Sequence, residues 1–182
     1  MKIRRLGLIL FSLAILTTTV VCQQSKRDEG IDLYRQDKFS EAAAMLEQAV
    51  ATDKSDSQAW LYLGAAYVHL NQAKDAKKAF GKSRARQATD WPKYDKKLTI
   101  LSKPNAKFYS NSNVYGTVEK VMIAIEFRAD GTIGIVFPFR NEHTKQESNA
   151  LDAAKRITFT PAMQNGKPIT VVTAIEYAFS QI

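Results

Sequence analysis

The chain has 182 residues and a formal net charge of +8, with 45% hydrophobic and 24% charged residues. This composition is ordinary for a globular protein and excludes wholesale disorder. The single cysteine excludes an intramolecular disulfide, and one cysteine with two histidines excludes the common zinc sites, so we expect no metal and no cofactor. The basic residues form no dense stripe with interleaved aromatics, which argues against a nucleic-acid partner.

Residues 1–22 have the pattern of an export signal. A basic start is followed by an apolar stretch of 16 residues, Leu6 to Val21. Because this stretch is shorter than the about 20 residues that span a membrane, a signal peptide or lipoprotein signal is favoured. Cys22 is the candidate lipidation site, although Val21 stands where such signals usually carry a small residue. Lipidation, simple cleavage and an uncleaved membrane anchor all remain open, and each leaves an exported chain, periplasmic or anchored facing the periplasm.

Residues 27–87 have helical periodicity and contain no proline. At an offset of 34 residues, Gly30 falls on Gly64 and Ala42 falls on Ala76. Small residues recur where helices approach closely, and large apolar residues recur where each helix buries its stripe. We therefore predict two helical hairpins, with helices near 27–36, 39–52, 57–70 and 73–87.

The second hairpin resembles a tetratricopeptide repeat through Trp60, Leu63, Gly64, Tyr67, Ala76 and Phe80. The resemblance implies a protein-binding module of two repeats over 27–87. We expect its aromatic side chains to pack between the helices, and we expect polar residues on the inner helices to line a groove: Tyr34, Asn71 and Lys74. Two repeats are fewer than the about three that usually make a stable stack. A further helix near 90–101 within a helix-and-linker segment (88–115), the C-terminal domain or another molecule could cover the exposed end.

Downstream, the period changes from helix to strand. Residues 121–127 alternate, Asp130-Gly131 predicts a type I′ hairpin, and 132–139 form the return strand, whose Pro138 indicates an edge position. A helix fits 145–156 and a last strand fits 169–180. Pro161 is expected to end the helical run, and Gly166 and Pro168 to shape the turn before that strand. The predicted fold is α+β: N-terminal tetratricopeptide hairpins, then a small three-stranded antiparallel sheet covered by one helix.

The domain at 116–180, with a lead-in from about 102, resembles the TonB C-terminal domain. The resemblance rests on six elements in order, including "GTVEKVMIAIEFRADGTIGIV", "LDAAKRITFTPA", "NGKPI" and "TAIEYAF", while Ile157 stands where that family usually has tryptophan. It implies recognition of outer-membrane transporters, whose extended peptide pairs with an exposed strand edge. The candidate edge is the last strand: Thr170, Val171, Val172, Thr173, Ala174, Ile175, Glu176 and Tyr177.

These patterns favour a non-enzymatic adaptor of the cell envelope that binds protein partners, among them an outer-membrane transporter. The chain lacks the long proline-rich spacer of a full TonB protein, since it has five prolines in all. The alternative is a structural tetratricopeptide lipoprotein that scaffolds an envelope assembly. Dimerisation through an open sheet edge is also left open. His69 and His143 are both expected on the solvated surface.

Overall fold

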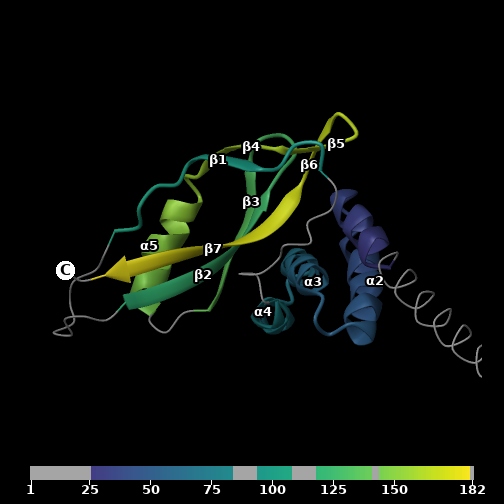
Figure 1. Ribbon diagram of the computed structural model, residues 1–182. Coiled ribbons are helices and arrows are strands. Elements are labelled where there is room, and N and C mark those ends of the chain that lie inside the picture. The colour runs from purple at the N-terminus through teal and green to yellow at the C-terminus, as the bar shows by residue number, and fades with distance from the viewer. Residues whose placement is uncertain (1–25, 84–93, 108–117, 141–143, 181–182) are drawn as a thin grey trace, which may run out of the picture.

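The computed structural model describes residues 26–83, 94–107, 118–140 and 144–180, and shows helices at one end and a sheet at the other (Figure 1). The predicted signal segment with Cys22, and His143, lie outside these residues. Within the described ranges, no helix combines the length and apolar character needed to cross a membrane.

The predicted helical hairpins are confirmed. A helix that includes residues 26–35 precedes α2 (Phe39–Thr52), and α3 (Ser57–His69) precedes α4 (Ala73–Lys82). The glycines stand where two helices touch: a Cβ on Gly30 would lie 2.7 Å from Cγ of Leu46, and one on Gly64 would lie 2.6 Å from the Phe80 ring. The repeated glycines therefore allow close helix packing, as the offset of 34 residues predicted.

The last repeat helix is shorter than predicted. It ends at Lys82 rather than near 87, because Ser83 adopts an extended conformation and its hydroxyl donates a hydrogen bond to the carbonyl of Phe80. A serine that bonds its own backbone competes with helix continuation. Residues 84–87 lie outside the described residues.

The predicted three-stranded antiparallel sheet is also confirmed. It consists of β2 (Val118–Phe127), β3 (Ile133–Arg140) and β7 (Val171–Ser180) in the order β3-β2-β7, with α5 (Thr144–Ala154) on one face. Pro138 lies in β3, an edge strand, where its missing N–H costs no ladder bond. β7 forms the opposite edge.

The two glycine turns differ from the prediction. At Asp130-Gly131 only Gly131 has a positive φ (85°), and its amide donates to the carbonyl of Arg128, so the hairpin closes through a type I turn followed by a left-handed residue. The two-residue turn with both φ values positive is Asn165-Gly166 instead, at 52° and 71°. It joins β5 (Ala162–Gln164) to β6 (Lys167–Ile169).

Besides β5 and β6, two further strands were not predicted. β1 (Thr99–Ser102) pairs antiparallel with β4 (Thr158–Thr160), and Lys96 bridges to Met163. The helix proposed near 90–101 is therefore wrong over its described part, 94–101, because β-branched Thr99 and Ile100 find a strand partner there. The last strand likewise begins at Val171 rather than at residue 169.

The sheet is covered on both faces. Val121, Ile123, Ile125 and Phe127 pack with α5, and Phe159 closes the gap with its ring 4.8 Å from that of Phe127. The opposite face packs against the repeat helices, mainly α3 and α4, through Met122, Ala124, Phe139 and Val172. In Figure 1, α5 and the repeat helices accordingly lie on opposite sides of the sheet. The C-terminal domain thus covers the repeats. It is one of the three candidates that the sequence analysis named for this role.

Candidate functional site

The repeats and the sheet meet around a buried carboxylate. Glu126 on β2 is 3% exposed, and its carboxylate accepts a hydrogen bond from the hydroxyl of Tyr34 (3.0 Å) and one from the amide of Ile135 (3.1 Å). Nε2 of His69 lies 3.4 Å from the same carboxylate. Burial acts to raise the pKa of Glu126, but the contact with His69 and the two hydrogen bonds outweigh it and hold the pKa below its ordinary value. A charged Glu126 therefore joins the two parts of the chain.

This cluster corrects two predictions. His69 is not on the solvated surface, because its ring stacks on Phe39 with centroids 3.8 Å apart and its side chain is 16% exposed. Tyr34 does not line an open groove, because it is 1% exposed and bonded to Glu126. Asn71, in the turn between α3 and α4 with φ of 61°, and Lys74 on α4 are both exposed. The three residues predicted for a groove therefore share no open surface.

The main-chain direction along β7 follows from its register with β2. Val121 to Phe127 pair without interruption with Tyr177 to Val171, so every second residue of β7 points its N–H and C=O away from β2. The amide of Val172 donates to the hydroxyl of Tyr62 (3.4 Å), and the carbonyl of Glu176 accepts from Nζ of Lys103 (2.9 Å). Both contacts come from outside the sheet. By the same alternation, the N–H and C=O of Ala174 point away from β2.

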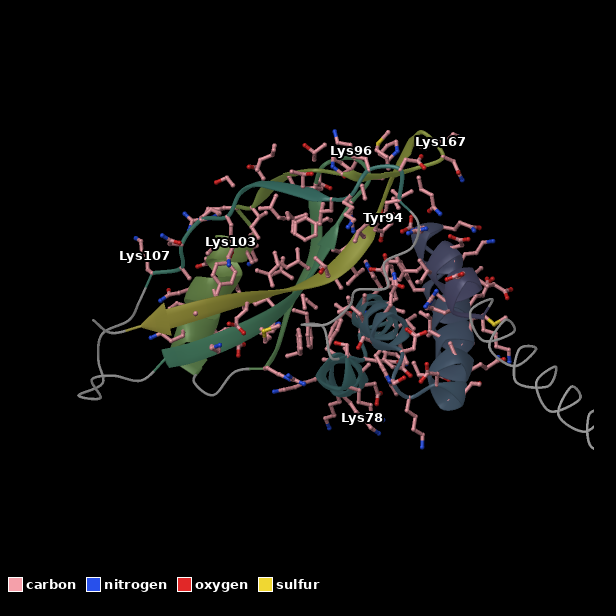
Figure 2. The ribbon with its side chains drawn as sticks, in the orientation of Figure 1. Lys78, Tyr94, Lys96, Lys103, Lys107 and Lys167 are labelled. Atoms are coloured by element: carbon pink, nitrogen blue, oxygen red, sulfur yellow. The ribbon has the colours of Figure 1, made fainter. Side chains whose placement is uncertain are left out.

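A groove of about 330 Å³ runs along this part of β7. Its walls are Thr173, Ala174 and Ile175 on one side and, on the other, residues of the segment before and within β1: Tyr94, Lys97, Leu98 and Ile100. Figure 2 shows Tyr94, Lys103 and Lys107 along the same side of the molecule as β7. Burial raises the pKa of Tyr94, so its phenol stays neutral and the groove wall there carries no charge.

The eight residues of the predicted edge therefore have different environments. Thr170 precedes β7, and its carbonyl accepts a hydrogen bond from Arg35 of the first helix (3.3 Å). Val171 and Val172 are fully buried against the rest of the chain. Thr173, Ala174 and Ile175 line the groove, and Glu176 and Tyr177 follow beside Lys103. The accessible edge thus begins at Thr173, a limit that no sequence pattern indicated.

A second pocket, of about 300 Å³, lies between α2, α3 and α4. Trp60, Leu63 and Tyr67 contribute to its lining, Lys82 lies 4.4 Å over the Trp60 ring, and the hydroxyl of Tyr67 donates to Glu47 (2.7 Å). Phe80 is fully buried, as predicted for the repeat aromatics, whereas Trp60 and Tyr67 also border this pocket. Its charged residues have mixed sign: Glu47, Asp75, Lys54, Lys78 and Lys82.

Metal ligands do not gather in the described part of the chain, where no group of three His, Cys, Asp or Glu side chains could hold an ion. The polar side chains that do converge, around Glu126, are engaged with one another in the contact between repeats and sheet. Two open surfaces of the described residues are the β7 groove and the pocket between the repeat helices.

A family model described as a tetratricopeptide repeat matches residues 33–101. The last described helix of this range ends at Lys82, and its described end, 94–101, runs into strand β1. The match supports the predicted repeat module, and tetratricopeptide repeats typically mediate protein–protein interaction. No curated protein matches the sequence. The match does not cover 116–180, so the likeness of that domain to the TonB C-terminal domain stays a prediction.

Proposed function

We propose that this protein is a non-enzymatic adaptor of the cell envelope that captures an extended segment of another protein along β7. The observation that carries the proposal is that β7 is a sheet edge whose outward main chain at Ala174 borders an open groove. Extended peptides add to such edges through main-chain hydrogen bonds, while neighbouring pockets select side chains. The resemblance of 116–180 to the TonB C-terminal domain suggests an outer-membrane transporter as the partner, and an exported chain as the location.

The test is a proline at Ala174. Its N–H points away from β2, so Ala174→Pro removes an outward donor without removing a bond of the β2–β7 ladder. The matched control is Ala174→Ser, which keeps the N–H and a small side chain. Wild type and Ala174→Ser should retain the same envelope protein from solubilised membranes, identified by mass spectrometry, and Ala174→Pro should lose it. Equal retention by all three proteins would rule out edge pairing.

A second candidate function is a structural lipoprotein whose repeats organise an envelope assembly. The observation in its favour is the packing of the sheet over the repeats, since Met122, Ala124, Phe139 and Val172 belong to the same core as the helices. In this case the sheet serves as a cap, and the pocket between α2 and α4 is the open surface of the repeats. Cys22→Ser should then release the protein from membranes, and Ala174→Pro should leave its partners unchanged.

A further inference from the structure

Four short strands lie outside the three-stranded sheet and form an outer ribbon. β1 pairs with β4, β5 pairs with β6, and an isolated bridge between Lys96 and Met163 joins the two pairs. Asp95 accepts a hydrogen bond from the amide of Gly166 (2.8 Å), which holds the β5–β6 turn beside the segment before β1. The outer ribbon comprises these four strands and the described residues on either side of β1, 94–98 and 103–107. In Figure 1 it forms the edge of the molecule opposite α4.

The outer ribbon is strongly basic. Its strands contain no acidic residue, and Asp95, which precedes β1, is bonded to the turn at Gly166. Its exposed basic residues are Lys96, Lys97, Lys103, Lys107 and Lys167. Figure 2 labels all of these except Lys97 and shows them along the same side of the molecule, whereas Lys78 of α4 lies on the opposite side.

Most of this positive charge is not neutralised within the described chain. Lys103 is held in place, because its ammonium lies 4.7 Å from the centre of the Tyr177 ring and donates to the carbonyl of Glu176 (2.9 Å). Neither contact neutralises its charge, since the carboxylate of Glu176 lies 3.1 Å from Nζ of Lys120. Among the described residues, no ion pair involves the other four lysines of the ribbon: Lys96, Lys97, Lys107 and Lys167.

Apolar side chains protrude among these lysines. Leu101 on β1 is 66% exposed and Ile100 beside it is 37% exposed, and they are the exposed large apolar residues of the described chain. Ile100 also lines the β7 groove, whereas Leu101 lies outside its lining. Lysines stand on both sides of the pair in the sequence, at Lys97 and at Lys103. The face therefore combines an apolar side chain in contact with water with an unneutralised positive charge around it.

A bilayer surface fits this composition better than an acidic protein does. Lysine is a point charge on a flexible stem, whereas arginine makes the fixed bidentate contacts with carboxylates, and the outer ribbon contains no arginine. Lipid phosphates offer a diffuse negative surface that flexible lysines can follow. The apolar layer beneath them accepts the side chain of Leu101 and the stems of the lysines. A second copy of the chain is disfavoured, because two basic ribbons would repel each other.

From this arrangement we infer that the outer ribbon lies on an anionic lipid bilayer, with its lysines at the lipid phosphates and Leu101 in the interfacial layer. The inference goes beyond the proposed function and does not depend on it, since no residue of β7 takes part in the contact. Because Lys97 and Ile100 also line the β7 groove, a docked ribbon holds that groove at the membrane surface.

The test places a fluorescent reporter on the outer ribbon of the full chain. Cys22→Ser removes the single cysteine, and Ser102→Cys then carries an environment-sensitive dye such as NBD beside Leu101. The protein is reconstituted into vesicles of phosphatidylcholine alone or with about 30% phosphatidylglycerol. We expect the emission to rise and shift to the blue with the anionic lipid only, and about 0.5 M salt should reduce the change. Because the dye reports on residue 102, it separates contact of the ribbon from attachment through the N-terminus.

Two variants of the ribbon test its two contributions. Lys96→Gln/Lys107→Gln/Lys167→Gln should lower the ratio of bilayer-bound to free ribbon about tenfold or more, because each lysine near an anionic surface contributes to the attraction. Leu101→Ser should lower the same ratio about fivefold, because it removes the apolar contact and leaves every charge in place.

The matched controls lie on α4, on the opposite side of the molecule. Lys74→Gln/Lys77→Gln/Lys78→Gln makes the same change in net charge as the triple substitution in the ribbon and should leave the emission of the dye at residue 102 unchanged. A dye attached through Lys74→Cys in place of Ser102→Cys should show no change in emission with the anionic lipid.

Three outcomes would overturn the inference. The first is an emission change that is the same in both kinds of vesicle or absent from both. The second is an equal response from the dyes at residues 74 and 102, which would indicate general adsorption of a basic protein. The third is an equal loss of response in the two triple lysine variants. Ala174→Pro, which tests edge pairing, should leave the lipid contact unchanged, so this inference and the proposed function can fail separately.

Discussion

At the scale of single residues, Glu126 is a side chain whose environment the sequence pattern does not show. It alternates with Ile125 and Phe127 on β2 and so lies on the opposite face of the strand. In the structure it is buried between β2 and the first repeat helices and bonded to Tyr34. A buried carboxylate is stable only with partners. Arg128 and the amide of Ile135 are local partners, but Tyr34, 92 positions earlier, and His69 lie on the repeat helices, and the alternation of β2 does not reveal them.

We predict that Glu126→Gln destabilises the protein by about 1–3 kcal/mol at pH 7, the range for a buried polar cluster that loses a charged member. The folded pKa of Glu126 lies below its ordinary value of 4.5, so its charge contributes stability that is present above that value. This stability is lost as the pH falls through the folded pKa. The gap in unfolding free energy between wild type and Glu126→Gln, measured by urea titration, should therefore narrow as the pH falls below 4.5.

His69 provides the control for this prediction. His69→Gln removes the ring that stacks on Phe39 but leaves the hydrogen bonds that Tyr34 and Ile135 donate to the carboxylate. This variant loses the first of the contacts that hold the pKa of Glu126 down, so the gap in unfolding free energy between it and Glu126→Gln should narrow less steeply below pH 4.5 than the gap for wild type. A gap between wild type and Glu126→Gln that stays constant from pH 7 to pH 3 would contradict the role given to the charge.

At the scale of helices and strands, the repeat signature has a direct mechanical meaning at Gly64. A Cβ at this position of α3 would lie within 2.8 Å of three atoms of the Phe80 ring on α4. Gly64→Ala should force the two helices apart and cost about 1–3 kcal/mol, as overpacked cores do. Gly81→Ala on α4 is the matched control, because nothing lies within 4 Å of its Cβ position. It should instead stabilise the protein by about 0.5–1 kcal/mol.

The measurement for the two glycines is the free energy of unfolding from urea titration, compared with wild type. We expect the two substitutions to change the free energy of unfolding in opposite directions. Gly64→Ala adds a steric clash, whereas Gly81→Ala adds helix propensity. If Gly64→Ala were neutral, α3 and α4 would not pack as closely as the positions of Gly64 and Phe80 require.

The elements that the sequence predicted correctly are those whose signal is local. Apolar alternation located β2, β3 and β7, and the recurrence of glycine and alanine located the repeat helices. The missed elements depend on distant partners: β1 has four exposed residues and exists because Thr99 and Ile100 pair with Thr160 and Phe159. The turn at Asn165-Gly166 did carry a local signal, the Asn-Gly pair itself, whereas the prediction for this turn rested on Gly166 and Pro168.

At the scale of the whole molecule, the candidate site is shorter than predicted. The prediction was an open edge over the whole last strand, whereas the accessible edge begins at Thr173. The alternation of apolar residues predicted β7 as a strand. Nothing in the sequence shows that the amide of Val172 donates a hydrogen bond to Tyr62, or that the carbonyl of Thr170 accepts one from Arg35. Both contacts come from the repeats, so the extent of the open edge depends on how the two parts of the chain pack. The repeats therefore limit the binding surface of the C-terminal domain.

This packing predicts that repeats and sheet unfold together. Phe139 on β3 packs with its ring 5.5 Å from that of Phe80 on α4, and it is 4% exposed. Phe139→Ala should lower the free energy of unfolding by about 3–5 kcal/mol. The repeats and the sheet should both be destabilised. The control is Leu101→Ala, which removes an apolar side chain that is 66% exposed and should change stability by less than about 0.5 kcal/mol.

The measurement follows urea unfolding with two probes in a Trp91→Phe background, where Trp60 is the single tryptophan. Trp60 fluorescence reports on the repeats, and the protection of β2 amides from hydrogen exchange reports on the sheet. Coincident transitions for the parent, shifted together by Phe139→Ala, are the signature of one cooperative unit. If β2 lost protection early in Phe139→Ala while the Trp60 transition stayed in place, the two parts would be independent.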